Sequence, residues 1–535
     1  MYRCSHCVFF FAVLFGCNDQ TEDPPTQPMG AVSQGQDQVE SPTAGNEIVN
    51  NRPDAERASS DASSADSASP EDPSPNTEPD EAQTFIDISN RLEGNGSKKR
   101  YGIAITDIDD DGDFEAVVTG YGASNEVWDL VDDRIVDVAP SSIKDPSRKA
   151  IGVGACDMDG DGREELYFLN VDRFGGLGEV SDRLFRREGD GWVDVFESTN
   201  NVSAVNRFSG RSVMCFDRNG DGQFGVFVAN YGGPMKLFEA DDQWQLSDVA
   251  PELGMALTTG GRSLVNLPEV DGRMRLFAGN ENGPNFFFTG TNPEYENIAE
   301  QKGIDDPYET VRGVAVLDAD EDGRLDLVYG NWDGPHRLFL QRDDRFENAV
   351  TDEMTVPSRI RTVIAADFDN DGYEEIFWNN IGEPNRLFKK VDGTWVEADI
   401  GAALEPDGLG TGAAIVDIDG DGRLELFVAH GESGEQPLSL FRWGANSNHF
   451  LRVNPLTSQG GAARGAIVKL ITEERQQLRV IDAGSGYLCQ MEPVAHFGLG
   501  QFSGSVSIEV RWPDGTLERV DDVEIDQTIS VPYPR

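Results

Sequence analysis

The sequence predicts an all-β protein: a seven-bladed β-propeller that an N-terminal strand closes, followed by a small all-β domain. Short apolar runs alternate with turn residues from residue 85 onward, which is typical of short strands. An acidic motif recurs at intervals of about 50 residues, the length of one four-stranded blade. The 58 Gly and 27 Pro among 535 residues favour many turns and few long helices.

The charge balance limits the possible partners. The chain carries 96 Asp and Glu residues against 44 Lys and Arg residues, a formal net charge of −52. Binding to phosphates requires a basic surface, so this balance excludes nucleic acid as a partner. The apolar segment at residues 8–15 is too short to span a bilayer. We therefore expect contact with a membrane only through a lipid anchor at the N-terminus.

The N-terminus has the pattern of an export signal. Arg3 precedes the apolar residues 8–15, and LFGC at residues 14–17 resembles a bacterial lipobox. The resemblance implies cleavage before Cys17 and attachment of a diacylglycerol to its sulfur; signal cleavage without a lipid is the alternative. We therefore predict a signal peptide at residues 1–16 and export to the cell envelope, as an outer-membrane lipoprotein or at the cell surface.

Residues 17–84 are predicted to form an acidic linker after the lipidated Cys17. They are rich in Ser, Pro, Asp and Glu and nearly lack aromatic and branched apolar residues. Such a segment cannot bury enough apolar surface to offset the entropy of ordering, so we expect it to be disordered. A flexible coil of this length reaches roughly 45 Å, enough to hold a folded domain clear of an anionic surface.

The acidic motif is a nine-residue loop with oxygen ligands at positions 1, 3, 5 and 9 and Gly at position 6. Five copies within residues 85–445 keep all four carboxylates, which the tight turn at Gly brings together. Ca²⁺ prefers a cage of about six to eight oxygens. We therefore predict five calcium sites, with the ligands Asp107, Asp109, Asp111 and Glu115; Asp157, Asp159, Asp161 and Glu165; Asp318, Asp320, Asp322 and Asp326; Asp367, Asp369, Asp371 and Glu375; and Asp417, Asp419, Asp421 and Glu425.

Two further units are degenerate. A sixth copy keeps three possible ligands, Asp217, Asn219 and Asp221. Gly225 replaces its last acid, so we predict a weak calcium site there. In the seventh unit Asp271 belongs to the turn, but Arg275 stands where the metal would need an anion. We therefore predict no calcium in this unit.

The loops have two other interpretations. An EF-hand also begins DxDxDG, but it requires a bidentate Glu at position 12 and a helix on each side. Position 12 is apolar or aromatic in all six copies, and the flanks, such as GIAIT at residues 102–106, are typical of strands. Ordinary Asp-Gly turns without a metal are the second alternative, which five complete carboxylate quartets disfavour.

The order of the strands predicts how the ring closes. A strand of the type that ends each unit already occurs at residues 85–88, before the first acidic loop, and the last loop unit has no such strand after it. We therefore predict that the strand beginning at Phe85 completes the seventh blade. This closure leaves no open sheet edge.

These motifs resemble the FG-GAP/VCBS repeats of integrin α-subunit heads and many bacterial surface proteins, over residues 85–445. Residues 446–535 contain GSGYL at 484–488, HFGLG at 496–500 and RWPDG at 511–515. These words are similar to the ASPIC/UnbV domain of the cartilage acidic protein family. The resemblance implies an integrin-α-like propeller with a small all-β domain and a secreted or surface role in calcium binding. It implies no established reaction.

Three further groups of residues are candidates for a role. One polar residue follows the second strand of most units: Asn170, Asn230, Asn280, Asn331, Asn380 and His430, with Gly120 in the first. These residues could line a ligand-binding mouth, but Asn also suits a left-handed residue at a strand end, and we favour this turn role. Tyr487, His496 and Arg511 could form a polar site, although packing roles are favoured. Cys156 and Cys215 differ in strand parity, so we expect opposite faces and no disulfide.

No catalytic motif of the GxSxG or HExxH type and no phosphate-binding Gly-Lys loop occurs. We therefore predict no catalytic residues and no cofactor other than Ca²⁺. The expected function is that of a monomeric, surface-tethered propeller that binds a protein or polysaccharide in adhesion, with calcium in a structural role. The alternative is an envelope enzyme, a glycan lyase or hydrolase, with a site on the propeller axis or at the junction with the C-terminal domain.

Overall fold

The computed structural model describes residues 84–189, 191–268, 271–291, 293–484 and 486–535. The predicted signal peptide, Cys17 and all of the predicted linker except Thr84 lie outside these residues. The propeller and the C-terminal domain belong to one compact unit. Within the described part of the chain, no helix is both long enough and apolar enough to cross a membrane.

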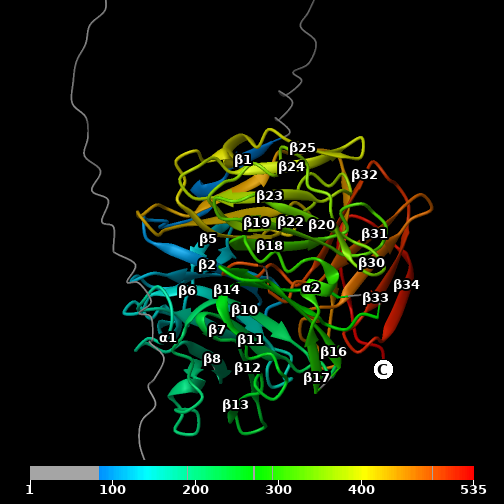
Figure 1. Cartoon of the computed structure of the whole chain (residues 1–535). Coiled ribbons are helices and arrows are strands. Elements are labelled where there is room, and N and C mark those ends of the chain that lie inside the picture. The colour runs from blue at the N-terminus through cyan, green and yellow to red at the C-terminus, as the bar shows by residue number, and fades with distance from the viewer. Residues whose placement is uncertain (1–83, 190, 269–270, 292, 485) are drawn as a thin grey trace, which may run out of the picture. The chain divides into compact units, whose positions relative to one another are not determined.

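Seven antiparallel blades of four strands form the propeller (Figure 1). Blade 1 contains β2 (Arg100–Thr106), β3 (Glu115–Gly120), β4 (Glu126–Val131) and β5 (Arg134–Asp137). Blade 2 contains β6 (Ala150–Cys156), β7 (Glu165–Asn170), β8 (Arg183–Glu188) and β9 (Gly191–Asp194). Blade 3 contains β10 (Ser209–Phe216), β11 (Gly225–Pro234), β12 (Lys236–Ala240) and β13 (Leu246–Asp248). Blade 4 contains β14 (Thr258–Asn266), β15 (Leu276–Glu281), β16 (Phe286–Thr291) and β17 (Glu294–Asn297).

The remaining blades follow the same order. Blade 5 contains β18 (Val311–Leu317), β19 (Asp326–Asn331), β20 (Arg337–Gln341) and β21 (Phe346–Asn348). Blade 6 contains β22 (Ile360–Ala366), β23 (Glu375–Asn380), β24 (Arg386–Val391) and β25 (Thr394–Glu397). Blade 7 contains β26 (Gly410–Val416), β27 (Glu425–His430), β28 (Ser439–Trp443) and β1 (Phe85–Asp87). The short helices α1 (Ser141–Lys144) and α2 (Ala299–Lys302), and 3-10 turns at Ser89–Arg91, Val195–Glu197 and Gly401–Leu404, lie in connections.

The position of each strand in its blade explains its composition. The first two strands of a blade are nearly continuous apolar runs, and every residue of β3, β6 and β7 is buried. The fourth strand alternates, as in β9, because only one of its faces is covered. The first strands β2, β6, β10, β14, β18, β22 and β26 contact one another in turn, and β26 contacts β2, so they line the axis.

The N-terminal strand closes the ring as the sequence predicts. Strand β1 pairs antiparallel with β28, with Phe85 opposite Trp443. The Phe85 side chain is 1% exposed, and its ring meets those of Phe368 and Trp443 edge to face, with centroids 5.0 and 5.1 Å apart. The first described strand thereby packs between the last two blades.

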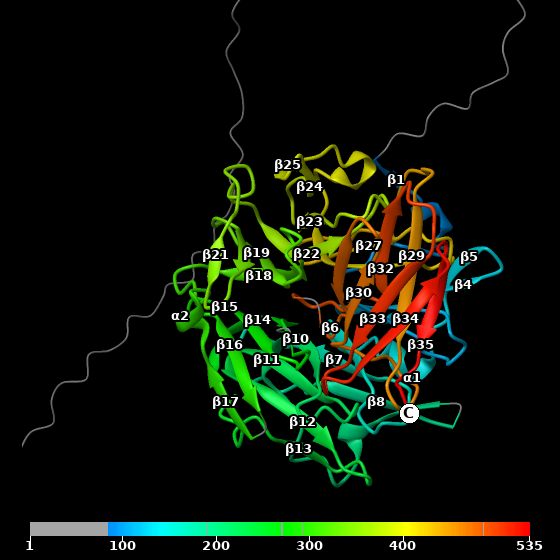
Figure 2. The same ribbon diagram turned by 90° about the vertical axis from the view of Figure 1, so that its right-hand side faces the viewer.

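The C-terminal domain consists of two small sheets (Figure 2). One has the order β32 (Ala495–Gly500), β29 (His449–Pro455) and β35 (Gln527–Val531), with β29 and β35 parallel. The other has the order β31 (Gln476–Val480), β30 (Ile467–Ile471), β33 (Val506–Arg511) and β34 (Leu517–Val523). Phe497, Ile508 and Trp512 belong to the core that the domain encloses. This arrangement matches the predicted small all-β domain.

The segment between β31 and β32 enters the axis of the propeller. We call residues 483–491 the axial segment; its residue 485 is not described. The backbone N–H of Gln490 donates to the Ile103 carbonyl in blade 1 at 2.8 Å. The Cys215 N–H of blade 3 donates to Ala483 at 2.7 Å, and the Leu264 N–H of blade 4 donates to Gly486 at 3.3 Å. The C-terminal domain therefore fills the centre of the ring.

Glycine in the inner strands makes room for the axial segment. A Cβ added to Gly102 would lie 2.4 Å from the carbonyl oxygen of Leu488. A Cβ at Gly412 would lie 2.8 Å from the Cys489 sulfur and 2.0 Å from the carbonyl oxygen of Tyr101. All three distances are shorter than van der Waals contact, so a larger residue at either position would displace its neighbours, the axial segment included.

Cys156 and Cys215 form a disulfide, contrary to the sequence-based expectation. Their Cα atoms are 5.5 Å apart. Cys156 is the last residue of β6 and Cys215 the last but one of β10. These inner strands of blades 2 and 3 are stacked neighbours rather than strands of one sheet. Two successive blades face each other with opposite sides of their equivalent strands. A disulfide between the blades therefore requires that the two cysteine side chains leave opposite sides of their own strands, as the different parity of Cys156 and Cys215 provides. The alternation was identified correctly, but the inference drawn from it was wrong.

The closing strand can be tested by truncating its anchor. The variant Phe85→Ala leaves a cavity among buried aromatic rings, and we expect it to lower the free energy of unfolding by about 3–5 kcal/mol. Urea unfolding followed by tryptophan fluorescence measures this loss. Val131→Ala, at a side chain 42% exposed, is the control and should change stability by less than about 0.5 kcal/mol. Equal stability of both variants would contradict a role for β1 in closure.

The disulfide can be tested by reduction. The bridge closes a sequence separation of 59 residues, so we expect its loss to cost on the order of 2–4 kcal/mol. A reductant should lower the urea midpoint of the natural protein. It should not affect the double variant Cys156→Ser/Cys215→Ser, which is already destabilised. A natural protein indifferent to reductant, with both thiols open to alkylation, would show that the bridge does not form.

Candidate functional site

The five complete acidic loops bring carboxylates together at one end of the propeller. In each loop three acids offer oxygens that lie within 4.8 Å of one another. The groups are Asp107, Asp109 and Glu115; Asp157, Asp159 and Glu165; Asp318, Asp320 and Asp326; Asp367, Asp369 and Asp371; and Asp417, Asp419 and Glu425. Each group joins the first and second strands of its blade, and each could hold a metal ion.

Backbone hydrogen bonds set the shape of every loop. In blade 1 the Gly112 N–H donates to Asp107 Oδ2 at 3.0 Å, and the Ile108 N–H donates to Glu115 Oε2 at 2.7 Å. The same two bonds recur in the other four complete loops. One oxygen of each terminal acid is thus held by the backbone. Gly112 has φ of 95°, the left-handed turn that the sequence analysis expected at position 6.

Position 4 of the loops is also left-handed, which the sequence analysis did not identify. Asp110, Glu321 and Asn370 occupy it with φ of 71°, 63° and 58°. In the other loops this position is Gly. The recurrence of Gly, Asp and Asn at position 4 could have predicted this conformation, because these residues tolerate the left-handed region best.

The electrostatics of the loops favour a cation. Burial and the neighbouring carboxylates raise the pKa of Glu115 to about 9. The same two causes raise the pKa of Asp367 to about 8. Four oxygens at positions 1 and 3 are buried and have no hydrogen-bond partner in the described part of the chain: Oδ1 of Asp318, Asp320, Asp367 and Asp419. A buried carboxylate oxygen without a partner is costly, and a hard divalent cation satisfies several such oxygens at once. The donor set therefore fits Ca²⁺.

The position 5 acids lie outside the closest groups in four loops. Their oxygens instead accept N–H groups from position 7, as from Arg163 to Asp161 at 2.9 Å. Asp371 belongs to the group in blade 6, whereas Glu375 does not. In the sixth loop the Gly222 N–H donates to Asp217 Oδ2 at 2.8 Å, so Asp217, Asn219 and Asp221 keep the same turn with only two acids.

Side chains from outside the motif change the charge of individual loops. In blade 4 Arg275 binds Asp271 at 2.7 Å and outweighs burial, so the pKa of Asp271 is lowered. In blade 6 Lys389 reaches Asp369, and its ammonium lies 3.3 Å from Glu375. In blade 7 Arg442 lies 3.3 Å from Asp419. Lys389 and Arg442 share one position, directly after the aromatic residue of the third strand, where blade 1 has Asp129. Alignment of that strand across the repeats could have found them.

The polar residues after the second strands have a different role from the one expected. They are buried, and none has the left-handed φ of the favoured turn role. Four amides donate to the carbonyl of a Pro four residues later: Asn230 to Pro234, Asn280 to Pro284, Asn331 to Pro335 and Asn380 to Pro384, at 2.6–2.7 Å. The His430 ring nitrogen lies 2.8 Å from the Pro437 carbonyl oxygen. These residues hold the connection to the third strand, so the turn role was wrong.

Tyr487, His496 and Arg511 do not converge. Tyr487 belongs to the axial segment. His496 lies 2.6 Å from the Asn370 side-chain oxygen, beneath the blade 6 loop. Arg511 packs against Gly272 of blade 4. The three residues thus have separate partners and form no common site.

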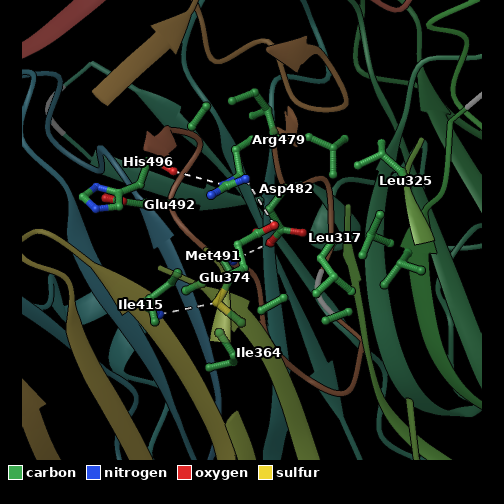
Figure 3. A pocket seen from close by; sticks show the side chains of 18 of the residues that line it. Leu317, Leu325, Ile364, Glu374, Ile415, Arg479, Asp482, Met491, Glu492 and His496 are labelled. Atoms are coloured by element: carbon green, nitrogen blue, oxygen red, sulfur yellow. Dashed lines mark hydrogen bonds and ion pairs between the residues drawn. The ribbon is translucent and has the colours of Figure 1, made fainter. Parts of the chain in front are cut away.

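A cavity of about 100 Å³ lies between the C-terminal domain and the inner strands of blades 4 to 7 (Figure 3). Its acids are engaged: Glu374 lies 3.3 Å from Arg479, and Asp482 accepts the Gly484 N–H at 3.1 Å. Burial beside Arg452 and Arg479 holds the pKa of His496 well below its usual value. The ion pair between Glu374 and Arg479 links the propeller to the C-terminal domain across this cavity.

Comparisons with known proteins found similar families, relatives and a solved structure. Residues 457–535 match the family described as ASPIC and UnbV, and residues 318–378 and 367–428 match the FG-GAP-like repeat. Cartilage acidic protein 1 of Xenopus tropicalis is 45% identical over 485 residues, which cover 83% of this chain and 75% of that protein. The Homo sapiens protein is 44% identical, with 83% and 73% covered. A crystal structure of BBS1N in complex with ARL6DN, soaked with lead, has a TM-score of 0.44 at 10% identity and covers 65% of this chain and 94% of that chain.

The two relatives, the repeat match and the C-terminal domain match point to one assignment. The matched regions include acidic loops of blades 5 to 7 and most of the C-terminal domain. The identity with the relatives extends over more than two thirds of each protein. The chain belongs to the cartilage acidic protein family.

Proposed function

We propose that the protein is an exported, calcium-stabilised propeller that binds a protein or polysaccharide ligand, in the manner of an adhesion module. The observation that carries the calcium proposal is the repetition of one carboxylate cluster in five blades. In blades 5 to 7 the loops also contain buried oxygens that have no hydrogen-bond partner among the described residues. The ligands are the acids at positions 1, 3, 5 and 9, with a backbone carbonyl from position 7. Asp217, Asn219 and Asp221 provide a sixth, weaker site.

The affinities of the five sites should differ. In blade 1 Asp129 adds a carboxylate near the loop, and its pKa is raised by burial and by Asp109 and Asp111. In blade 6 Lys389 brings a competing ammonium group. A cation next to the carboxylates lowers their attraction for Ca²⁺. We therefore expect tighter binding in blade 1 than in blade 6.

Calcium at several loops would also stiffen the contact between the two domains. The Gly498 N–H donates to Asp367 at 3.0 Å, and Arg452 lies 3.1 Å from Asp417. These partners come from the C-terminal domain, whereas the acids belong to the loops of blades 6 and 7. An ion that fixes the loop carboxylates thereby fixes the surface on which the C-terminal domain rests.

Export is supported by the disulfide between Cys156 and Cys215, because such bonds persist mainly in oxidising compartments. Lipidation of Cys17 and an outer-membrane location stay predictions of the sequence. The acidic surface is consistent with a soluble, self-repelling exterior domain.

Calcium removal tests the structural role. At millimolar calcium and extracellular-type affinities each site adds on the order of 1 kcal/mol by mass action. We expect chelation to lower the melting temperature by several degrees, and calcium to restore it. Isothermal titration should give about five equivalents per chain. The variant Asp107→Asn/Glu115→Gln should lose one of these, whereas Asp271→Asn should lose none. An unchanged melting temperature in chelator would contradict the proposal.

Ligand recognition needs a separate experiment. Calcium-loaded and chelated protein should be compared for capture of components from the surface fraction of the source cells and for binding to a glycan array. We expect saturable binding without turnover, weakened by chelation. Conversion of a bound glycan into products would favour the enzyme alternative instead.

A further inference from the structure

Every inner strand carries a β-bulge at the same position. The pairing register between the first and second strands shifts there in all seven blades. The first residue inside each bulge is Tyr101, Ile151, Arg211, Arg262, Arg312, Arg361 and Thr411 in blades 1 to 7. A bulge redirects a side chain that regular pairing would place elsewhere. Four successive blades, 3 to 6, place an arginine at this position, and we call these four residues the arginine crescent.

The arginine crescent surrounds the tip of the axial segment. Its four side chains are buried, at 2–6% exposure, as is Tyr487. The Arg361 guanidinium carbon lies 5.9 Å from the centre of the Tyr487 ring. Burial raises the pKa of Tyr487, but the four neighbouring guanidinium groups outweigh burial, so that the pKa lies below its usual value. The crescent and the phenol therefore form one cluster.

The positive charge of the crescent is only partly balanced. Glu281 accepts a hydrogen bond from Arg262 at 2.6 Å and lies 3.1 Å from Arg312. Glu432 pairs with Arg361. The hydrogen bonds of Arg211 go to backbone carbonyls, those of Gly210 and Phe174. Among the described residues, four guanidinium groups thus have two carboxylates as their ion-pair partners, and two positive charges remain.

Two donors in the cluster have no partner. The Nε atoms of Arg312 and Arg361 are buried and make no hydrogen bond within the described part of the chain. Burial and the neighbouring Arg262 lower the pKa of Arg312 to about 10, so it stays charged at neutral pH. A buried charged donor without an acceptor is costly. An acceptor with negative charge would satisfy both donors.

Aromatic rings hold the guanidinium planes in place. Arg262 lies over Tyr231 and Arg361 over Trp332, each 4.3 Å from the ring centre. This stacking orients the planar fork that binds oxyanions in a bidentate manner. Such a site is ordered before a ligand arrives, which reduces the entropy lost on binding.

The cluster borders the surface. Phe174, 67% exposed, lies over the guanidinium groups of Arg211 and Arg262 at 5.6 and 5.5 Å. Glu432, whose side chain is 48% exposed, borders it at Arg361. The acidic loops follow the opposite ends of the same inner strands. Access to the crescent is therefore independent of the acidic loops.

We propose that the arginine crescent and Tyr487 form an oxyanion-binding site on the propeller axis. The group bound is a single carboxylate, sulfate or phosphate, either a free ion or the acidic group of a saccharide. The unpaired donors of Arg312 and Arg361 face it, and the two unbalanced charges match a dianion. The site requires no metal in the acidic loops, so its failure and that of the calcium proposal are distinguishable.

The first experiment measures sulfate binding to the full calcium-loaded protein. Isothermal titration with sodium sulfate at ionic strength held constant with sodium chloride should give one saturable site. Arg312→Gln and Arg361→Gln should each weaken binding about tenfold or more, the usual effect of losing a charged hydrogen bond. Arg519→Gln, at an exposed ion pair with Glu509, is the control and should bind like the natural protein. No saturable binding, or equal binding by all variants, would overturn the proposal.

A second pair of variants, with smaller changes, tests whether weaker binding reflects a loss of folding. Arg361→Lys keeps the charge but removes the planar fork, and Tyr487→Phe removes only the phenol hydroxyl. Both should weaken sulfate binding while the calcium stoichiometry and the circular dichroism spectrum stay unchanged. Unchanged sulfate affinity in both folded variants would contradict the assignment. Anomalous scattering from selenate in crystals should place the ion beside Arg312 and Arg361, and selenate elsewhere would also contradict it.

The source of the oxyanion is distinguished by competition. N-acetylglucosamine 6-sulfate should displace sulfate if the site accepts the acidic group of a saccharide, and the unsulfated sugar should not. If only inorganic sulfate or phosphate binds, the ligand is a free ion. Both results support an oxyanion site, whereas displacement by the unsulfated sugar would show recognition of the sugar ring and overturn the proposal.

Discussion

The entry of the axial segment into the propeller is the contact on which the rest of the structure depends. Its backbone pairs with inner strands of blades 1, 3 and 4, and the Gln490 side chain accepts the Ala155 N–H of blade 2 at 2.6 Å. The segment sets the position of the C-terminal domain over the acidic loops and of Tyr487 inside the arginine crescent. Glycine is required at positions 102 and 412 because a Cβ atom at Gly102 or Gly412 would overlap the axial segment. One peptide segment therefore links both charged clusters.

The blades differ in how they balance the negative charge of their acidic loops. Each blade turn gathers carboxylates in a partly buried place, where like charges repel and desolvation is costly. Blade 4 meets the problem with Arg275 from its own loop, and blades 6 and 7 bring in Lys389 and Arg442 from the third strand. Among the described residues, no such cation joins the blade 1 cluster, which has Asp129 nearby instead. The remaining negative charge is what a bound divalent cation would neutralise.

Much of this architecture could be predicted from the sequence because it repeats. The loops, the blades and the closure by Phe85 follow from residue types that recur at fixed spacing. The disulfide was misjudged because side-chain parity was compared as if Cys156 and Cys215 shared one sheet. The axial segment could not be predicted, since GSGYL shows no periodic pattern and its partners are hundreds of residues away. The arginine crescent was missed because a bulge, not regular alternation, directs Arg211 and its equivalents. Four arginines at one repeat position were nevertheless a visible signal.

A chain with a net charge of −52 can still present a cationic site. In blade 3 Asp217 follows Arg211 by six positions, roughly 20 Å of extended chain. This distance is about twice the Debye length at 0.1 M ionic strength, so solvent-exposed charge at one end is largely screened at the other. Each inner strand of blades 3, 5 and 6 thus carries a guanidinium at its start and a carboxylate loop at its end. The repeat that gathers carboxylates for a cation at one end of the axis therefore gathers guanidinium groups for an anion at the other.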